Sequence, residues 1–207
     1  STGTWTQFVA LSWLVYRLTH SAVLLGAVGF SIQFPIFALA ALGGVAADRF
    51  DRRKLILITQ VAAAAQSFLI AILALTGHIE VWHIFVLGLG IGTTTAFDIP
   101  ARQSFIVETV ERKDLMNAIA LNSSAFQSAR MVGPALAAFI LAAGFEEGFC
   151  FLLNSFSYLV MIVAIYAIRH RNEPRAHPTR DVFKELRDGL RFVWTQRAVR
   201  YLIAYLS

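Results

Sequence analysis

Residues 22–54 of the 207-residue chain read AVLLGAVGFSIQFPIFALAALGGVAADRFDRRK. The first 26 of these residues carry no charge, whereas six of the last seven are charged. A helix of about 20 apolar residues is long enough to cross a hydrocarbon core of about 30 Å. This stretch therefore predicts a transmembrane helix that ends in a short, strongly charged connection.

The composition of the whole chain agrees with a membrane location. Hydrophobic residues make up 57% of the chain and charged residues 15%, where soluble domains carry about 25% charged residues. So few polar residues cannot cover a soluble globule, and so many apolar residues exclude a disordered chain. The single cysteine, Cys150, cannot form an internal disulfide, which excludes a disulfide-stabilised scaffold.

Further apolar runs of membrane-spanning length follow the first, and all of them favour helices. Four complete runs lie at 55–76, 81–97, 115–143 and 149–168, while the short run 5–16 and the run 201–206 resemble parts of further spans. We therefore predict an all-α membrane protein with a six-helix bundle over 1–170, whose first helix is truncated. After this bundle, the sequence predicts a basic linker over 171–198 and a truncated seventh helix over 199–207.

The linker has a pattern of its own. Its apolar residues recur at helical spacing with basic residues between them, which is typical of an amphipathic helix lying on a membrane surface. These apolar residues are Val182, Phe183, Leu186, Leu190 and Val193.

Lysine and arginine occupy every second connection between the predicted spans. The connections after the runs 22–47, 81–97 and 149–168 are basic, whereas 77–80 and 144–148 contain no lysine or arginine. This alternation follows the positive-inside rule, and it predicts an inner-membrane protein whose basic connections face the cytoplasm. Cations that bind nucleic acid would not alternate in this way, so we expect no nucleic-acid partner.

The charged connection also carries a specific motif. Residues 44–54, GVAADRFDRRK, resemble the loop signature G-x-x-x-D-R-x-G-R-R/K of the major facilitator superfamily in spacing and in place, with Asp51 at the position of the second glycine. Five more stretches are similar to the branch that contains bacterial enterobactin exporters and macrolide efflux pumps. They are GTW at 3–5, WLVY at 13–16, AFDIPARQ at 96–103, NAIALNS at 117–123 and GPALA at 133–137.

This resemblance implies the N-terminal half of a twelve-helix bundle. Members of the superfamily work by alternating access and bind substrate near the bilayer midplane, between two six-helix halves. The implied partners are a small-molecule substrate, the lipid bilayer and a C-terminal half of the same transporter.

The motif itself is a candidate conformational latch. Asp48 and Arg52 are four residues apart, so on a continuing helix they would share a face and pair. Asp98 ends the span 81–97 at the same depth and is a second possible partner for Arg52 or Arg49. With Gly44 and Arg53, these residues are expected to form a charged cluster that, in the family, stabilises the outward-facing state. The alternative is that the cations only set the topology.

Arg130 is the candidate for substrate binding. A charged side chain inside a span costs at least about 2.5 kcal/mol, so it normally faces a partner or a water-filled cavity. Ser123, Gln127 and Arg130 fall on one face of a helix and could attract an anionic or hydroxyl-rich substrate. Further candidates for the cavity lining are Gln33, Asn122 and Asn154. The alternative is that Arg130 pairs structurally with a neighbouring helix, for example with Asp98.

Four other residues in the spans suit close packing or hinge bending. Small residues at every fourth position allow helices to approach closely in lipid. The residues concerned are Gly88, Gly92, Gly133 and Pro134. Near the end of the first span, Arg17 is expected to extend to the outer lipid headgroups.

The sequence favours a secondary active exporter of small amphipathic molecules, siderophore-like or drug-like, coupled to protons. It contains no nucleophile–base arrangement, nucleotide-binding loop or paired histidines at helical spacing, so we predict neither an enzyme nor a metal or cofactor site. The alternative is a non-transporting membrane scaffold or assembly protein on the same fold.

Overall fold

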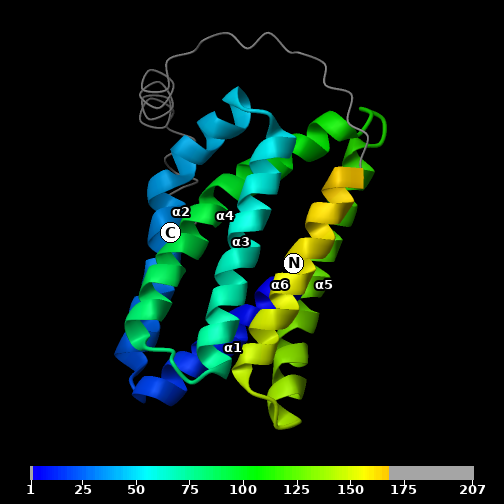
Figure 1. The fold of residues 1–207 in the computed structure, drawn as a ribbon. Coiled ribbons are helices and arrows are strands. Elements are labelled where there is room, and N and C mark those ends of the chain that lie inside the picture. Colours follow the sequence, from blue (N-terminus) through cyan, green and yellow to red (C-terminus); the bar gives the residue numbers. More distant parts are fainter. Residues whose placement is uncertain (1, 168–207) are drawn as a thin grey trace, which may run out of the picture. The chain divides into compact units, whose positions relative to one another are not determined.

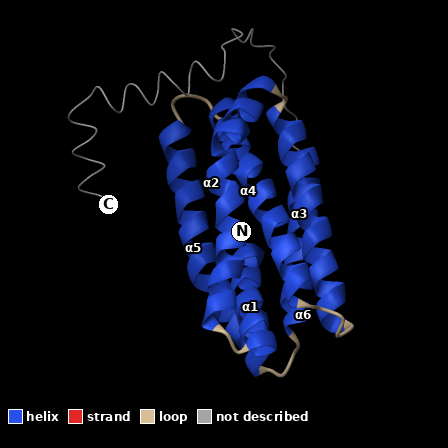
Figure 2. Ribbon diagram, turned by 90° about the vertical axis from the view of Figure 1, so that its left-hand side faces the viewer, coloured by secondary structure: helices blue, strands red, loops and turns tan. Residues whose placement is uncertain are grey.

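The computed structural model describes residues 2–167, so the predicted linker helix and seventh helix lie outside the described residues. These 166 residues form α-helices joined by short connections, without strands, which confirms the predicted all-α class (Figures 1 and 2). The helices are α1 (Thr2–Thr19), α2 (Ala22–Arg49), α3 (Arg52–Leu75), α4 (Val81–Thr109), α5 (Leu115–Ala142) and α6 (Glu147–Ala167).

Local sequence explains where these helices begin and end. The Ser21 side chain accepts a hydrogen bond from the Leu24 N–H at 3.4 Å and caps α2, while Glu80 and His83 form a capping box at α4. Gly77 and Gly144 follow α3 and α5 at φ of 70° and 83°, a conformation that glycine adopts without strain.

One predicted boundary is wrong. The apolar run 81–97 ends at Asp98, but α4 continues for 29 residues to Thr109, and its length is therefore about 43 Å. Hydrophobicity reports which part of a helix lies in lipid, whereas the backbone hydrogen bonds continue past the first charged residue. The extension places Asp98 and Arg102 inside a helix and carries Glu108 to its far end.

Five of the helices, α2 to α6, are long and apolar enough to cross a membrane. Many of their large apolar side chains point outward, and Phe37 on α2 is 87% exposed. Outward-facing apolar side chains on helices that satisfy their own backbone hydrogen bonds are suited to lipid or to a further helical unit.

The connections lie alternately at the two ends of the bundle (Figure 1). The α2–α3 and α4–α5 connections share one end, which we call the basic end because Arg49, Arg52, Arg53, Arg112 and Lys113 lie at it. The α1–α2, α3–α4 and α5–α6 connections share the opposite end.

Contacts between helices reveal an internal repeat that the sequence does not. The main pairs are α2 with α4, α1 with α5, α3 with α6, α3 with α4 and α1 with α6. Exchanging α1 with α4, α2 with α5 and α3 with α6 maps this set of pairs onto itself. Because α1 and α4 run in opposite directions, the two three-helix units form an inverted repeat.

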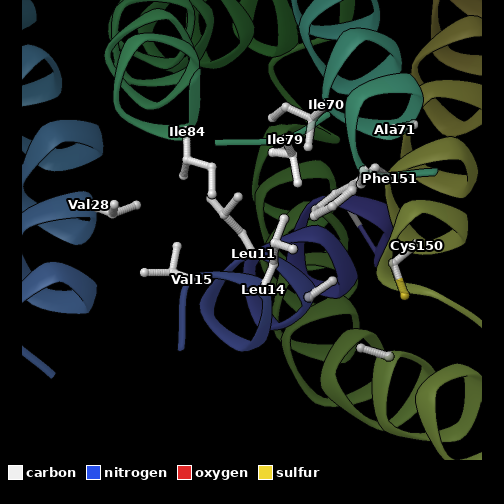
Figure 3. Packing of buried hydrophobic residues seen from close by; sticks show 13 residues of the cluster. Leu11, Leu14, Val15, Val28, Ile70, Ala71, Ile79, Ile84, Cys150 and Phe151 are labelled. Carbon is white, nitrogen blue, oxygen red and sulfur yellow. The ribbon is translucent and has the colours of Figure 1, made fainter. Parts of the chain in front are cut away.

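The main apolar core lies where α1, α3 and α6 meet. Leu14, Ile70 and Phe151 are fully buried there, beside Leu11 and Ile84 (Figure 3). The α2–α4 and α1–α5 pairs instead approach through small residues: a methyl group on Gly92 would overlap the Ile32 carbonyl, and one on Gly133 would overlap Trp5. Close backbone approach of this kind holds helices together in lipid, where apolar burial contributes little.

We predict that Gly92→Ala destabilises the protein by about 1 to 3 kcal/mol, because the added methyl group forces α2 and α4 apart. Gly29→Ala is the matched control, since nothing lies within 4 Å of a Cβ at that position. Thermal unfolding of both variants in detergent measures the difference. Equal melting temperatures for the two variants would contradict the packing argument.

Candidate functional site

A single guanidinium connects three helices at the basic end. Arg52, at the start of α3, forms an ion pair with Glu108 of α4 and lies 3.7 Å from Asp48 of α2. Its Nε donates a 2.9 Å hydrogen bond to the Ala47 carbonyl near the end of α2. The Arg52 side chain is only 14% exposed, so these contacts are partly removed from water and are stronger than ordinary surface pairs.

The backbone between Asp48 and Arg52 does not continue as one helix, although the two residues pair as predicted. The chain leaves α2 after Arg49 and turns at Phe50, whose N–H bonds the Ala46 carbonyl. Asp51 then caps α3, because its Oδ1 accepts a 3.1 Å hydrogen bond from the Lys54 N–H. Aspartate thus replaces the signature glycine here as a helix cap, at φ −58°, where no glycine is needed. The turn still brings Asp48 and Arg52 together.

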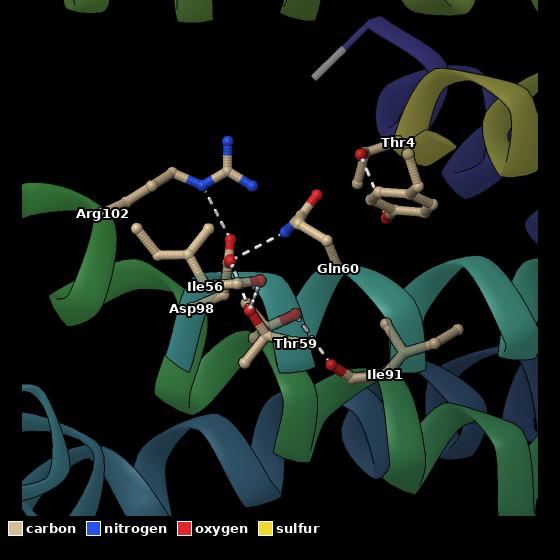
Figure 4. A network of polar contacts seen from close by, with 9 residues as sticks. Thr4, Ile56, Thr59, Gln60, Ile91, Asp98 and Arg102 are labelled. Carbon is tan, nitrogen blue, oxygen red and sulfur yellow. Dashed lines mark hydrogen bonds and ion pairs between the residues drawn. The ribbon is translucent and has the colours of Figure 1, made fainter. Parts of the chain in front are cut away.

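The predicted pairing of Arg52 with Asp98 is wrong, because the α4 partner of Arg52 is Glu108. Ten residues separate Asp98 from Glu108, which is about 15 Å along a helix, and only Glu108 reaches the depth of the α2–α3 connection. Asp98 belongs to a second network, where it accepts bonds of 2.8 Å from Arg102, Thr59 and Gln60 (Figure 4). This network joins α3 to α4.

The remaining motif residues have separate roles. Arg53 donates a 2.8 Å hydrogen bond to the Tyr166 carbonyl and lies 5.7 Å from the Tyr166 ring centroid, which ties α3 to the end of α6. Arg49 is the exposed last residue of α2. Gly44 has open space where a Cβ would lie, whereas at Gly43 a Cβ would overlap the Ala96 carbonyl. The close approach of α2 to α4 thus falls at Gly43 and not at the motif glycine.

A third polar group lies inside the bundle, between α1, α3 and α6. The Gln7 Oε1 atom accepts hydrogen bonds from Ser67, at 2.7 Å, and from the Asn154 amide; Ser67 also donates to the Phe151 carbonyl. Asn154 is 0% exposed. Asn154, predicted to line a substrate cavity, therefore lies buried between helices. Polar Gln7 in an otherwise apolar run was the signal for an interhelical partner.

The other predicted cavity residues lie on open surface. Asn122, Ser123, Gln127 and Arg130 are exposed on α5, and Gln33 is exposed on α2. Whether they line a substrate cavity stays a prediction.

The predicted alternative of an Arg130–Asp98 pair is not found. The Arg130 guanidinium lies 5.5 Å from the centroid of the Trp5 ring of α1. Trp5 in turn contacts Phe126 edge-on, with 5.9 Å between ring centroids. No carboxylate lies within ion-pair distance of Arg130 among residues 2–167.

Another ion pair lies at the end opposite the basic end. Arg17, near the end of α1, lies 3.0 Å from Glu147, the first residue of α6, whose side chain is only 4% exposed. Arg17 is therefore a helix-to-helix contact and not simply a side chain that extends toward headgroups. Within the described helices and connections, no three His, Cys, Asp or Glu side chains are placed to hold a metal ion.

Comparison with known proteins agrees with this architecture. The family model described as transmembrane secretion effector, of the major facilitator type, matches residues 1–205. The chain belongs to this family. The resemblance inferred from residues 44–54 is thereby confirmed, and the six helices are part of a major facilitator bundle.

Three characterised relatives illustrate the range of this family. The chain is 29% identical to the staphyloferrin A transporter of Staphylococcus aureus, over 78% of this chain and 41% of the relative. It is 24% identical to the multidrug efflux pump Tap of Mycolicibacterium fortuitum, over 97% and 51%, and 26% identical to the enterobactin exporter EntS of Shigella boydii, over 89% and 44%. The chain thus spans about half the length of the relatives that it matches.

We predict that Arg52→Gln destabilises the bundle of residues 2–167 by more than roughly 1 kcal/mol, the value of an exposed ion pair. The larger loss is expected because the carboxylate of Glu108 is half-buried and would be left without its partner. Asp48→Asn is the matched control in the same cluster. The Asp48 side chain is 71% exposed, so water replaces its lost interaction and little change is expected. Thermal unfolding compares the two variants, and an equal loss in both would contradict the assignment of Glu108 as the main partner.

Proposed function

We propose that the chain supplies the N-terminal half of a proton-coupled exporter of small amphipathic molecules that works by alternating access. The observation that carries this proposal is the cluster of Arg52, Asp48 and Glu108, which we call the Arg52 cluster. Its guanidinium links the ends of three helices, and alternating access must move these helices together. The names of the relatives, which include siderophore and drug exporters, support the same class of substrate.

In this proposal the cluster acts as the latch. Arg52 is held by Glu108 from within the bundle, while the Asp48 carboxylate is largely exposed and has room for a second partner. A donor from the C-terminal half can bind Asp48 in one conformation and leave it in another. Charged hydrogen bonds at a partly dry interface are strong enough to bias such an equilibrium by a few kcal/mol.

Transport itself is tested by reconstituting the full-length polypeptide in liposomes with an imposed pH gradient. Siderophores, macrolides and lipophilic cations form the substrate panel. Accumulation or expulsion of at least one class that collapses when the gradient is dissipated supports the proposal. A folded protein that moves none of them would instead favour a non-transporting scaffold.

Asp98 is our candidate for the proton-carrying group, because it lies farther inside its helix than the other carboxylates of residues 2–167. Protonation would weaken its bond to Arg102 and free that guanidinium to move. We predict that Asp98→Asn abolishes transport driven by a pH gradient while substrate counterflow continues, because exchange needs no net proton movement.

Glu111→Gln is the control for the Asp98 substitution. Glu111 is an exposed carboxylate that pairs with Lys113 on the α4–α5 connection. Gradient-driven transport by this variant should equal that of the unmodified protein. Full gradient-driven transport by the Asp98→Asn variant would remove Asp98 from the coupling role.

The inner-membrane orientation yields a further prediction. The native cysteine, Cys150, is buried, so an introduced cysteine can be labelled selectively. In intact cells, a membrane-impermeant maleimide should label Glu146→Cys on the α5–α6 connection. It should label Arg112→Cys on the α4–α5 connection only after the cells are permeabilised. The reverse pattern would place the basic end outside.

A further inference from the structure

Arg130 differs from every other charged side chain in the described helices. Three charged residues lie more than five residues from a helix end: Asp98, Arg102 and Arg130. Asp98 and Arg102 neutralise each other at 2.8 Å, whereas Arg130 has no carboxylate partner among residues 2–167. The middle of the described bundle therefore carries one uncompensated positive charge.

The position of this charge is costly unless water or an anion reaches it. An arginine at the centre of a spanning helix costs about 2.5 to 3.5 kcal/mol on insertion scales, and such residues face cavities or partners. Arg130 is exposed on α5, on the same helix face as Gln127 and Ser123. Neutral amide and hydroxyl groups next to a cation leave the local potential positive.

The contact with Trp5 leaves the binding capacity of Arg130 free. Its guanidinium lies 5.5 Å from the indole centroid, and no described residue accepts a hydrogen bond from its N–H groups. A cation–π contact involves the face and the charge of the guanidinium and none of its N–H groups. The five N–H donors therefore remain available to the two oxygens of a carboxylate. Trp5 and Phe126, in edge contact at 5.9 Å, add aromatic surface next to these donors.

We propose that Arg130 selects organic anions as substrates: the two oxygens of a carboxylate bind the guanidinium and an adjoining apolar ring packs on Trp5 and Phe126. This inference rests on the proposed transport function and narrows it, because the same surface repels lipophilic cations. The charge, the free donors and the neighbouring rings all lie at the α1–α5 contact.

A matched pair of probes tests the proposal. 4-(1-Pyrenyl)butyrate and 4-(1-pyrenyl)butylamine share one apolar skeleton and differ in charge. The full-length protein is placed in nanodiscs of phosphatidylcholine, and binding is followed by energy transfer from tryptophan to pyrene, with empty nanodiscs subtracted. We expect the anion to bind about tenfold more tightly than the cation, which corresponds to one charge-assisted interaction.

Three variants then assign the preference to Arg130. Arg130→Gln should bind both probes equally, while Arg130→Lys should retain a preference for the anion. Arg112→Gln makes the same change in net charge on the exposed α4–α5 connection and should leave the tenfold preference intact. Thermal unfolding of each variant separates a binding effect from a folding effect.

Three results would overturn the inference. The first is an unmodified protein that prefers the cation or neither probe, a result that does not depend on the folding of any variant. The second is an Arg130→Gln variant that keeps the anion preference. The third is gradient-driven transport of cations by the unmodified protein, which would leave the proposed exporter function in place. Failure of all transport, with the anion preference at Arg130 intact, would overturn the exporter function instead.

Discussion

Hydrocarbon offers no hydrogen-bond partners, and this constraint shapes the described bundle at every level. Each span must be a helix because only a helix satisfies its backbone within one segment. Several polar side chains between spans bond to a partner on another helix. Gln7 accepts bonds from Ser67 and Asn154 between α1, α3 and α6, and Asp98 takes donors from both α3 and α4. These bonds add polar contacts to the packing of α1, α3, α4 and α6.

Small residues allow two further helix pairs to approach closely. The α2–α4 and α1–α5 pairs are equivalent under the inverted repeat, and both approach through glycine, at Gly92 and at Gly133. Ion pairs then fasten opposite ends of the bundle: Arg52 with Glu108 at the basic end and Arg17 with Glu147 at the other. A unit joined in its middle and at both ends is suited to move as one body, as the alternating access that we propose would require.

Two ion pairs at the helix ends, Arg52 with Glu108 and Arg17 with Glu147, join different helices, so these partners could be found only once the helices were placed. Arg130 alone lies deep in a span without a carboxylate, on exposed surface beside an aromatic ring. This charge, which the described residues do not compensate, is the one on which our proposal of anion selection rests.

The sequence by itself determined the class of the protein, the helices of residues 2–167 and the family. These follow from apolar run length and from the motif at residues 44–54, both of which are local properties. It also singled out Arg130, because the cost of a charge in lipid does not depend on what surrounds it.

Only the tertiary structure decided the partners. Arg52 pairs with Glu108 and not with Asp98 because α4 continues past its apolar run, and Asn154 is interior because α1 lies against α6. The inverted repeat is likewise visible in helix contacts and not in the residues. Partner choice depends on helix length, rotation and depth, and these are fixed by packing between segments far apart in the chain.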